Sequence, residues 1–380
     1  MQSWDVIVAG GGVAGVAAAL AAKRAGAQRV LLLERQYLLG GLATCGLIAI
    51  YLPICDGRGE KVCTGLAEEM LLLSMKNGAE GRYPSAWVDG NDADARKKQR
   101  YQVQYNPWLF AIDCEQMLIR EGVSILYGAF VCAAEKENGK LKSIEVVHKS
   151  GREVLSAAAF VDATGDADVF WHAGAPTAEN AEGNILASWY YATEDGENKL
   201  HWVGFHDQTD GGRQPAGQNA GRRHYRGLDA RELTEMSVEA HRVLKDRFLE
   251  KGQDSPSHSL SSVALIPQVR MTRRAEGHVV FGDEKPFAHV KTSVGRVTDW
   301  RTSGNAFELP FETLQSCELD NLYAAGRCIS VTDAMWDITR SIPNCVVSGQ
   351  AAGVAAALQG QSVLNIQNEL TRQQVVLHFA

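Results

Sequence analysis

The sequence has eight cysteines among its 380 residues, but no two of them form a C-x-x-C pair. No histidine cluster completes a zinc-binding pattern either, so we expect no metal site. Cysteines scattered through apolar segments are typical of reduced thiols in a cytosolic core rather than of a disulfide framework. The N-terminal Met-Gln-Ser-Trp-Asp also lacks the basic stretch of a signal peptide. These absences predict a cytoplasmic protein.

The sequence has fewer basic than acidic residues, with 38 Lys and Arg against 45 Asp and Glu. Its net charge is therefore −7 with His neutral. A mildly acidic chain lacks the basic surface that non-specific nucleic-acid binding requires, so we expect no nucleic-acid partner. Long hydrophobic runs are absent as well. The three least charged stretches, 6–22, 37–55 and 341–368, are each interrupted by Gly, Pro or polar residues, which predicts no membrane span.

The N-terminal region contains the most specific pattern of the chain. Residues 5–9 form a short β-branched run, which is typical of a buried parallel strand. A G-x-G-x-x-G motif, an Ala-rich helical segment over 14–25 and a second apolar strand over 29–33 follow in that order. The glycines of the motif are Gly10, Gly12 and Gly15, and the second strand ends in Glu34. This order predicts a βαβ unit that binds a dinucleotide.

Each feature of the motif has a physical role in such a unit. Gly10 permits the tight turn, Gly12 lets the backbone approach a pyrophosphate, and Gly15 lets the helix pack close to the sheet. The helix N-terminus offers unpaired N–H groups and the positive end of its dipole to phosphates. Glu34 can accept hydrogen bonds from an unmodified ribose, which disfavours the 2′-phosphate of NADP. FAD and NAD both fit this motif.

Three further segments favour FAD over NAD. The glycine pair at 40–41 fits a loop that passes close to a bulky ligand beyond the pyrophosphate, which a plain NAD unit does not need. Residues 159–166 have the pattern of a strand running into a glycine turn, although a turn without a ligand would show the same pattern. Near the C-terminus, another strand runs into the Gly-Arg pair at 326–327, and a helix is expected to open near Gly349 and continue to 358.

These segments resemble the FAD-dependent oxidoreductases of the glutathione-reductase-like superfamily. Within it, they are similar to the subfamily with G-G-x-A-T after the second strand and with A-G-R-C-I-S, R-x-x-P-x-C and G-Q-A-A-G near the end. The matching residues are Gly40, Gly41, Ala43, Thr44, Thr164, Gly165, Asp166, Ala325 to Ser330, Arg340, Pro343, Cys345 and Gly349 to Gly353. The resemblance covers both ends of the chain and is more specific for FAD than for a substrate.

The resemblance implies an FAD site to which both ends of the chain contribute. Its cofactor-binding residues would be Gly10, Gly12, Val13, Ala14, Gly15, Glu34, Arg35, Gly40, Gly41, Ala43, Thr44, Val131, Thr164, Gly165, Asp166, Gly326, Arg327, Pro343, Asn344 and Gly349. The helix expected to open near Gly349 would direct its positive end at the pyrimidine edge of the flavin. In such enzymes the flavin performs the redox step and the protein orients the reactants.

The substrate side of the site is less specific. The candidate catalytic residues are Arg340 and Asp333, and the candidate substrate residues are Arg270, Arg273 and Arg274. A fixed guanidinium at Arg340 can bind a carboxylate or a hydroxyl pair bidentately, the alternative being an ion pair with Asp333 or Asp337. For the other three arginines, the alternative is a salt-bridged surface. Asp333, Asp337 and His289 are candidate proton acceptors.

This sequence departs from the subfamily pattern at three positions. Met271 stands where the subfamily tends to carry Glu, and Asp333 stands where many members carry His. Asn344 replaces a common Thr. The departure at Asp333 weakens any catalytic role carried over from a histidine there.

The expected fold class is α/β, with a Rossmann-like FAD-binding domain whose parallel sheet forms three layers, interleaved with a mixed α+β substrate or cap domain. The FAD-binding domain comprises 1–50, 101–175 and 318–380, with an insertion at 51–100 and the cap at 176–317. Within the cap, 207–227 is a polar Gly- and Arg-rich stretch, expected to be a long mobile loop or a partner surface. Charged amphipathic residues over 228–250 predict a helix.

The expected function is that of an FAD-dependent oxidoreductase, which transfers a hydride between a small polar organic substrate and the flavin N5. The electron acceptor or donor and the oligomeric state stay open. No second complete G-x-G-x-x-G marks a separate NAD(P)H domain. Two alternatives remain: a flavin-binding redox sensor or partner protein without turnover of its own, and an NAD-dependent dehydrogenase.

Overall fold

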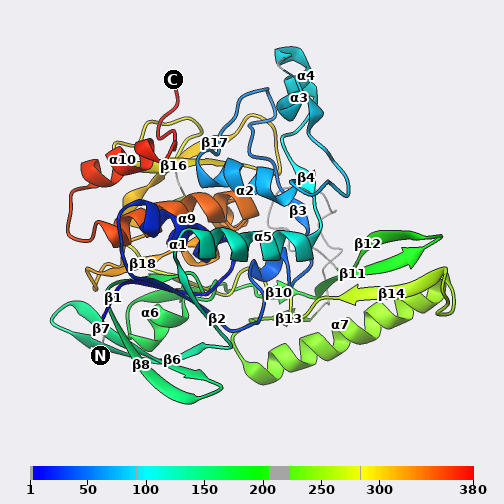
Figure 1. Ribbon diagram of the computed structural model, residues 1–380, viewed down its shortest axis with the longest axis horizontal. Coiled ribbons are helices and arrows are strands. Elements are labelled where there is room, and N and C mark those ends of the chain that lie inside the picture. Colours follow the sequence, from blue (N-terminus) through cyan, green and yellow to red (C-terminus); the bar gives the residue numbers. More distant parts are fainter. Residues whose placement is uncertain (1–2, 91, 205–222, 283) are drawn as a thin grey trace.

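The computed structural model describes residues 3–90, 92–204, 223–282 and 284–380. Its centre is a seven-stranded sheet in the order β5-β2-β1-β8-β7-β6, with β18 paired to β8 (Figure 1). The strands are β1 (Trp4–Ala9), β2 (Val30–Glu34), β5 (Ser124–Tyr127), β6 (Phe130–Glu137), β7 (Lys140–His148), β8 (Gly151–Asp162) and β18 (Leu322–Ala324). The strands β5, β2, β1, β8 and β18 are parallel where they pair, which confirms the predicted α/β class.

Strand β8 joins the parallel part of the sheet to an antiparallel part. Its second half, 157–162, lies parallel to β1 and β18, whereas its first half, 151–156, is antiparallel to β7. β7 is in turn antiparallel to β6. The second half is largely buried and the first half largely exposed. This difference follows because helices cover parallel strands on both faces, while antiparallel hairpins can face water on one side.

Two helices rich in small residues cover one face of the parallel strands. α1 (Val13–Arg24) and α9 (Ile342–Ala357) are buried along most of their length and pack against each other. A Cβ atom at Gly349 would lie 2.2 Å from the Ala14 carbonyl oxygen, and one at Gly353 would lie 2.1 Å from that of Ala18. The two backbones therefore touch, which only glycine permits. The beginning and the end of the chain form one core.

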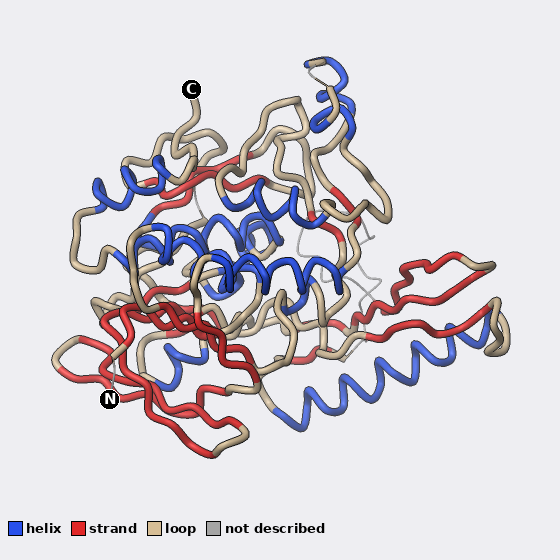
Figure 2. Tube along the Cα trace, viewed as in Figure 1, coloured by secondary structure: helices blue, strands red, loops and turns tan. Residues whose placement is uncertain are grey.

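A second unit projects from this core as an elongated arm (Figures 1 and 2). It consists of the antiparallel sheet β12-β11-β14 and of one long helix lying along it. Their bounds are β11 (Ala187–Glu194), β12 (Glu197–Gly204), β14 (His258–Val263) and α7 (Ala230–Lys251). Tyr190 of β11 packs on Leu244 and Phe248 of α7. Its neighbour Tyr191 points to the opposite face, against Leu47, because side chains alternate along a strand.

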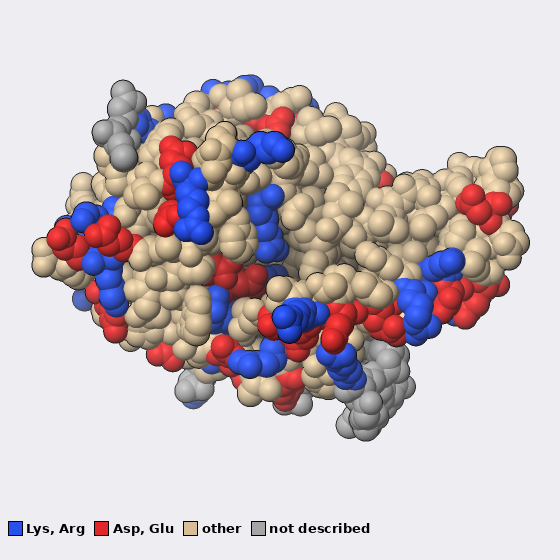
Figure 3. Space-filling model, turned by 90° about the horizontal axis from the view of Figure 1, so that it is seen from below, with Lys and Arg blue, Asp and Glu red and all other residues tan. Residues whose placement is uncertain are grey.

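The surface of the arm is mixed in charge. Arg242 of α7 pairs with Glu239 and Asp246, one turn away on either side. The face in Figure 3 shows positive and negative side chains interspersed, with no large area of one sign.

The other elements surround the core and carry the connections. The helices are α2 (Leu66–Ser74), α3 (Ser85–Val88), α4 (Ala93–Lys98), α5 (Pro107–Arg120), α6 (Asp168–His172), α8 (Asp333–Thr339) and α10 (Val363–Arg372). The strand pairs are β3 (Ile50–Tyr51) with β4 (Val103–Gln104), β9 (Thr177–Glu179) with β15 (Arg273–Ala275), β10 (Asn184–Ile185) with β13 (His224–Tyr225), and β16 (Ser293–Thr298) with β17 (Ala306–Pro310). The described part of the chain also contains the short 3-10 helices η1 (Gly41–Ala43), η2 (Phe311–Thr313) and η3 (Gly326–Cys328).

One predicted boundary is wrong. The helix expected to open near Gly349 begins at Ile342, with Pro343 in its first turn. Proline fits there because the first N–H groups of a helix have no intrahelical partner. Gly349 therefore lies inside α9, and its role is the close approach to α1 rather than a helix N-terminus. The positive end of α9 lies at Ser341 and Ile342.

Other expectations have mixed outcomes. The helix predicted over 228–250 is present as α7. The loop predicted over 207–227 falls mostly outside the described residues, and the division into domains stays a prediction. All eight cysteines are free thiols, six of them buried. Among the described residues, no helix has both the length and the hydropathy needed to cross a bilayer.

Candidate functional site

A cleft opens at the carboxyl ends of β1 and β2, beside the N-terminus of α1, where dinucleotides bind in open α/β sheets. It encloses about 1150 Å³ of space, counted with its open mouth. Of the predicted site residues, the cleft is lined by Gly10, Gly12, Val13, Ala14, Glu34, Arg35, Gly40, Gly41, Ala43, Val131, Thr164, Gly165, Gly326, Arg327 and Arg340. Residues from both ends of the sequence thus meet in one cavity.

The three glycines of the N-terminal motif have different surroundings. Gly10 has a φ of +102°, and a Cβ atom there would lie 2.4 Å from the Ala163 carbonyl oxygen. A Cβ atom at Gly15 would lie 1.8 Å from the Gly10 carbonyl oxygen. At Gly12 a Cβ atom would meet nothing within 4 Å. Gly10 and Gly15 are therefore fixed by the fold itself, whereas the open space at Gly12 is available to a ligand.

The N-terminus of α1 faces this open space with unpaired donors. Gly12 is its N-cap residue and has no side chain to bond the N–H groups of the first turn, and no acidic residue lies in that turn. These N–H groups and the positive end of the helix dipole favour an anion such as a pyrophosphate.

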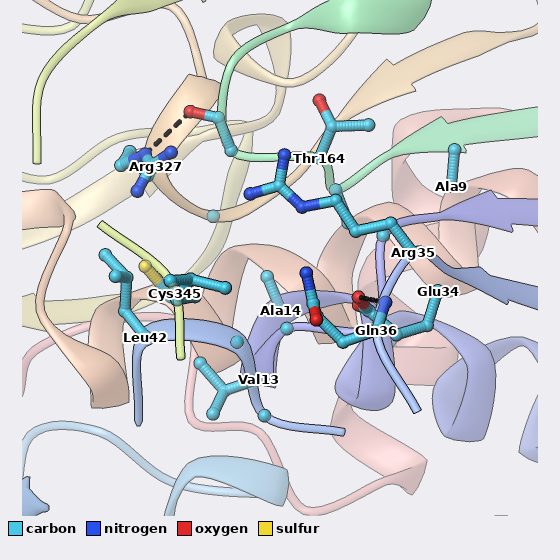
Figure 4. Close-up of a pocket in the computed structure, with 18 of the residues that line it drawn as sticks. Ala9, Val13, Ala14, Glu34, Arg35, Gln36, Leu42, Thr164, Arg327 and Cys345 are labelled. Atoms are coloured by element: carbon cyan, nitrogen blue, oxygen red, sulfur yellow. Dashed lines mark hydrogen bonds between the residues drawn. The ribbon is translucent and has the colours of Figure 1, made fainter. Parts of the chain in front are cut away.

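Glu34 holds the end of β2 against the glycine turn. Its carboxylate accepts hydrogen bonds from the backbone N–H groups of Gly11 and Gln36, each at 2.7 Å. Burial raises the pKa of Glu34, and the backbone N–H groups oppose that rise. Figure 4 shows Glu34, Arg35 and Gln36 along one side of the cleft, with the Arg35 guanidinium lying toward Thr164. The carboxylate is thus placed where a ribose would follow a pyrophosphate.

The glycine pair at 40–41 forms a turn that contacts the glycine turn at 10–12. The Gly40 N–H donates to the Gly11 carbonyl at 2.8 Å, and Gly40 forms a parallel bridge with Gly12. Gly40 has a φ of +100°. The Thr44 hydroxyl donates to the Leu39 carbonyl and closes the turn from behind. Thr44 does not line the cleft, so its contribution is to the shape of the turn.

The Arg327 side chain forms hydrogen bonds with two other segments of the chain on the side of the cleft across from the Gly40 turn. Its guanidinium donates to the Gly165 carbonyl at 2.7 Å, the Val269 carbonyl at 2.8 Å and the Asp166 carboxylate at 2.5 Å. The Asp166 carboxylate also accepts from the Thr272 hydroxyl at 2.6 Å. Asp166 is therefore a structural anchor behind the cleft, while Gly165 lines it together with Arg327, which Figure 4 shows.

Asp168 is a cleft residue that the sequence reasoning missed. It opens α6 and accepts from the Arg273 guanidinium at 2.8 Å. Burial, followed by the nearby carboxylates of Asp166 and Asp162, raises its pKa to about 6. An acidic residue two positions after the Thr-Gly-Asp turn was the available signal for it.

Arg340 lines the cleft beside the N-terminus of α9. One of its terminal nitrogens pairs with Asp337, whose other oxygen accepts from Arg301 at 3.1 Å. The buried Nε of Arg340 has no hydrogen-bond partner among the described residues. The ion pair considered from the sequence is therefore present, with Asp337 rather than Asp333, and it leaves one donor of the guanidinium unused.

The remaining candidate catalytic and substrate residues lie away from the cleft lining. Asp333 is half exposed and pairs with Arg274 at 2.9 Å. Arg273 is buried, where it donates to Asp166 and Asp168 and lies over the Trp171 ring. The Arg270 backbone N–H donates to the Asn184 side chain at 2.7 Å. For Arg273 and Arg274, the geometry fits the salt-bridged alternative.

Several predicted cofactor residues support the cleft without lining it. Asn344 is buried, and its side chain bonds the backbone of Thr298 and Ile338. The residues in this group are Gly15, Thr44, Asp166, Pro343, Asn344 and Gly349.

Lining residues that the sequence reasoning did not single out for the cofactor include Gln36, Leu42, Ile266, Val269, Ile342 and Cys345. Burial raises the pKa of the Cys345 thiol to about 12, so it is a neutral lining group.

The fold and the cleft together define a dinucleotide-binding α/β protein whose site is built from both ends of the chain. A sequence model of the family described as FAD dependent oxidoreductase matches residues 5–188 and 185–376. The chain belongs to this family, and it is an FAD-dependent enzyme. The cofactor is FAD, as predicted, rather than NAD. The uncapped α1 N-terminus, the open space at Gly12 and the placement of Glu34 all fit this group.

Solved structures of similar fold span almost the whole chain. The chain matches p-nitrophenol 4-monooxygenase PnpA from Pseudomonas putida DLL-E4 at 14% identity and a TM-score of 0.53, covering 98% of this chain and 84% of that one. A geranylgeranyl bacteriochlorophyll reductase-like protein from Thermoplasma acidophilum matches at 14% identity and a TM-score of 0.51, covering 98% and 83%. These likenesses show the fold. No curated protein sequence matches the chain.

Proposed function

We propose that this enzyme transfers a hydride between a small polar organic substrate and the flavin N5 of FAD bound in the cleft. When bound, FAD supplies the redox chemistry, because its ring system can accept or release a hydride. The main support for the proposal is that one cavity has both an anion-binding side and a side that carries a fixed positive charge. An uncapped helix N-terminus lies on one side, and the incompletely paired Arg340 lies on the other.

The N-terminal wall would hold the cofactor by its diphosphate. The first-turn N–H groups of α1 are the donors, and Gly12 leaves room for the phosphates. Glu34 would accept hydrogen bonds from the ribose, and Arg35 supplies a positive charge at the same rim. Arg327 fixes the glycine turn at 165, so that the cleft keeps its width.

The C-terminal wall would orient the substrate. Arg340 lines the cleft with a fixed positive charge, and its guanidinium can donate to a carboxylate or hydroxyl oxygen of a substrate. Asp337 and Arg301 hold the guanidinium in place from behind. A substrate with an anionic or hydroxyl-bearing group is therefore favoured over a wholly apolar one. Asp333 is not a direct proton acceptor in this proposal, because it lies outside the lining.

Two finer assignments are part of the proposal. We infer that the chain belongs to the glutathione-reductase-like branch of the family, on the support of the Gly-Gly turn at 40–41 and the Gly-Arg pair at 326–327. We also infer a cytoplasmic protein, on the support of eight free cysteines.

The test is an anaerobic screen of the FAD-loaded enzyme against small alcohols, amines, hydroxy acids and amino acids. A substrate would bleach the flavin absorbance, and readmitted oxygen, a quinone or a nicotinamide would restore it if it serves as the acceptor. A reduced enzyme is screened in parallel against C=C and C=O compounds. Because the fold is shared with a monooxygenase, oxygen consumption is recorded as well.

The outcomes separate the alternatives. A flavin that dithionite reduces but no metabolite reduces or oxidises would favour a redox sensor or partner protein without turnover. A protein that never becomes yellow, even after addition of FAD, would overturn the proposal altogether.

A further inference from the structure

Two histidines and one glutamate meet outside the FAD cleft. They are His289 in the loop before β16, Glu308 in β17 and His378 in the C-terminal segment. The ligand-type atoms of these three side chains all lie within 4.8 Å of one another. None of the three lines the cleft. No metal-binding pattern is visible here in the sequence, because 19 and 70 positions separate these residues along the chain (308 − 289 and 378 − 308).

Glu308 is a buried carboxylate at the centre of this cluster. Its side chain is 1% exposed, whereas those of His289 and His378 are 70% and 35% exposed. The carboxylate accepts from the backbone N–H groups of Val290 at 2.8 Å and Phe379 at 2.9 Å. A buried carboxylate needs compensation of its negative charge as well as hydrogen bonds.

Among the described residues, no arginine or lysine forms an ion pair with Glu308, and Arg296 interacts with this carboxylate only through space. Arg296 is opposite Glu308 in the β16–β17 ladder. Its guanidinium instead donates to the Lys61 carbonyl at 3.2 Å and lies over the Phe379 ring. The groups paired with the carboxylate that can carry positive charge are the two imidazoles alone, so far as the structure describes the chain.

The spacing of the ligand atoms is close to that of a metal site. Two ligands about 2.1 Å from a tetrahedral zinc ion lie roughly 3.4 Å apart. Glu308 Oε2 lies 2.8 Å from His378 Nδ1 and 3.8 Å from His289 Nδ1, so the two distances bracket this value. The imidazole centroids are 4.5 Å apart. Small rotations of the exposed His289 ring and the half-buried His378 ring would bring all three atoms to one ion.

We propose that His289, Glu308 and His378 bind one divalent transition-metal ion of the Zn²⁺ type. Two imidazole nitrogens and one carboxylate oxygen suit Zn²⁺, whereas Mg²⁺ and Ca²⁺ prefer sets made of oxygen alone. Three protein ligands leave the solvent side for a water molecule. The ion neutralises the buried carboxylate and fastens the C-terminal segment to β17. The proposal is independent of the proposed reaction, since the cluster lies outside the cleft.

Zinc binding is measured by calorimetric titration of the FAD-loaded, tag-free and metal-stripped enzyme with Zn²⁺. We expect one high-affinity ion per chain and no competition from excess Mg²⁺. The variant His289→Ala should lose affinity by about tenfold or more while keeping the flavin spectrum. His289 is the suitable position because its exposed ring can be removed without opening the core. The matched control is His241→Ala, an exposed histidine on α7, which should bind zinc as the wild type does.

A second measurement tests whether the ion also fastens the C-terminal segment to β17. Hydrogen exchange at the Phe379 amide, which donates to Glu308, should slow on addition of Zn²⁺ in the wild type and not in His289→Ala. The proposal is overturned if the wild type binds no stoichiometric zinc. It is equally overturned if His289→Ala binds as tightly as the wild type, or if His241→Ala loses affinity to the same extent, since the ion would then be adventitious.

Discussion

At the scale of single residues, the glycines of the N-terminal motif differ in what they do. Gly10 and Gly15 face backbone atoms at distances that exclude a side chain, so the fold requires them. Gly12 faces open space, so only a ligand can require it. The same sequence motif therefore contains two residues for folding and one for binding, and substitutions can separate these roles.

The substitution Gly12→Val should leave folding intact and remove FAD. The backbone at Gly12 has φ −64° and ψ 175°, which a β-branched residue accepts. Its side chain would occupy the space reserved for the diphosphate. We expect the affinity for FAD to fall by about 100-fold, corresponding to an overpacking cost of about 3 kcal/mol. The measurement is the flavin-to-protein absorbance ratio together with thermal unfolding of the apoprotein. A yellow Gly12→Val protein would contradict the placement of the diphosphate.

The substitution Arg340→Ala should separate substrate binding from cofactor binding. Asp337 keeps its contact with Arg301, so loss of the Arg340 guanidinium does not leave a buried carboxylate unpaired. We expect an unchanged flavin spectrum and bleaching by a hit substrate that is slower by about 100-fold, from loss of a charge-assisted hydrogen bond worth about 3 kcal/mol. Arg340→Lys is the matched comparison, because it keeps the positive charge but cannot form the two parallel hydrogen bonds of a guanidinium. Bleaching at the wild-type rate in Arg340→Ala would reject Arg340 as a substrate contact.

Asp168 predicts a pH dependence of stability. Its pKa is raised to about 6 in the folded protein, against an ordinary value of 3.8. The folded state therefore holds the proton more tightly, and the contribution of this group is fully present below about pH 4 and lost as the pH rises through about 6. We expect urea unfolding of the apoprotein to show the wild type losing stability relative to Asp168→Asn between pH 4 and pH 7. The asparagine oxygen can still accept from Arg273, so a difference that stays constant with pH would contradict the assignment.

At the scale of elements, small residues decide where the helices lie. The order strand, glycine turn, helix and strand was predictable over the first 34 residues because the periodic patterns there are local. The start of α9 was not predictable from its glycines. Gly349 looked like the opening of a helix, yet it is the point where α9 touches Ala14 of α1. A glycine required by packing and a glycine required by a turn look alike in a sequence.

This packing gives a prediction for Gly353→Ala. Its Cβ atom would lie 2.1 Å from the Ala18 carbonyl oxygen, and backbone atoms on both helices cannot yield cheaply. Although alanine is the better helix former, we expect a loss of about 3 kcal/mol in the free energy of unfolding. Urea denaturation measures it, with Gly12→Ala as the control in which the added methyl group meets no protein atom. A Gly353→Ala protein as stable as the wild type would mean that α1 and α9 are further apart than described.

At the scale of the whole molecule, the sequence indicated the ends of the chain well and the middle poorly. The patterns at 5–34 and 326–353 are local and tied to a cofactor, so they could be recognised. The contacts that define the rest connect distant residues, such as Asp337 with Arg301, or Asp166 with Thr272 and Arg327. Single-sequence patterns do not record which charged residues meet, because pairing depends on the tertiary fold.

Removal of FAD should loosen both ends of the chain together. The cofactor cleft is lined by the N-terminal turn at 10–14 and by the C-terminal residues Gly326, Arg327 and Arg340, so ligand binding stabilises the folded state through both. FAD at a free concentration of 100 times its dissociation constant should raise the free energy of unfolding by about 2.7 kcal/mol. Hydrogen exchange of the apoprotein and the FAD-loaded protein provides the spatial test. We expect amides of the α1 first turn and of the residues around Gly326 to exchange faster without FAD, while the arm formed by β11, β12, β14 and α7 stays unchanged. Faster exchange at the N-terminal turn alone would show that the C-terminal segment does not contact the cofactor, and the site would then have to be redrawn around the first fifty residues.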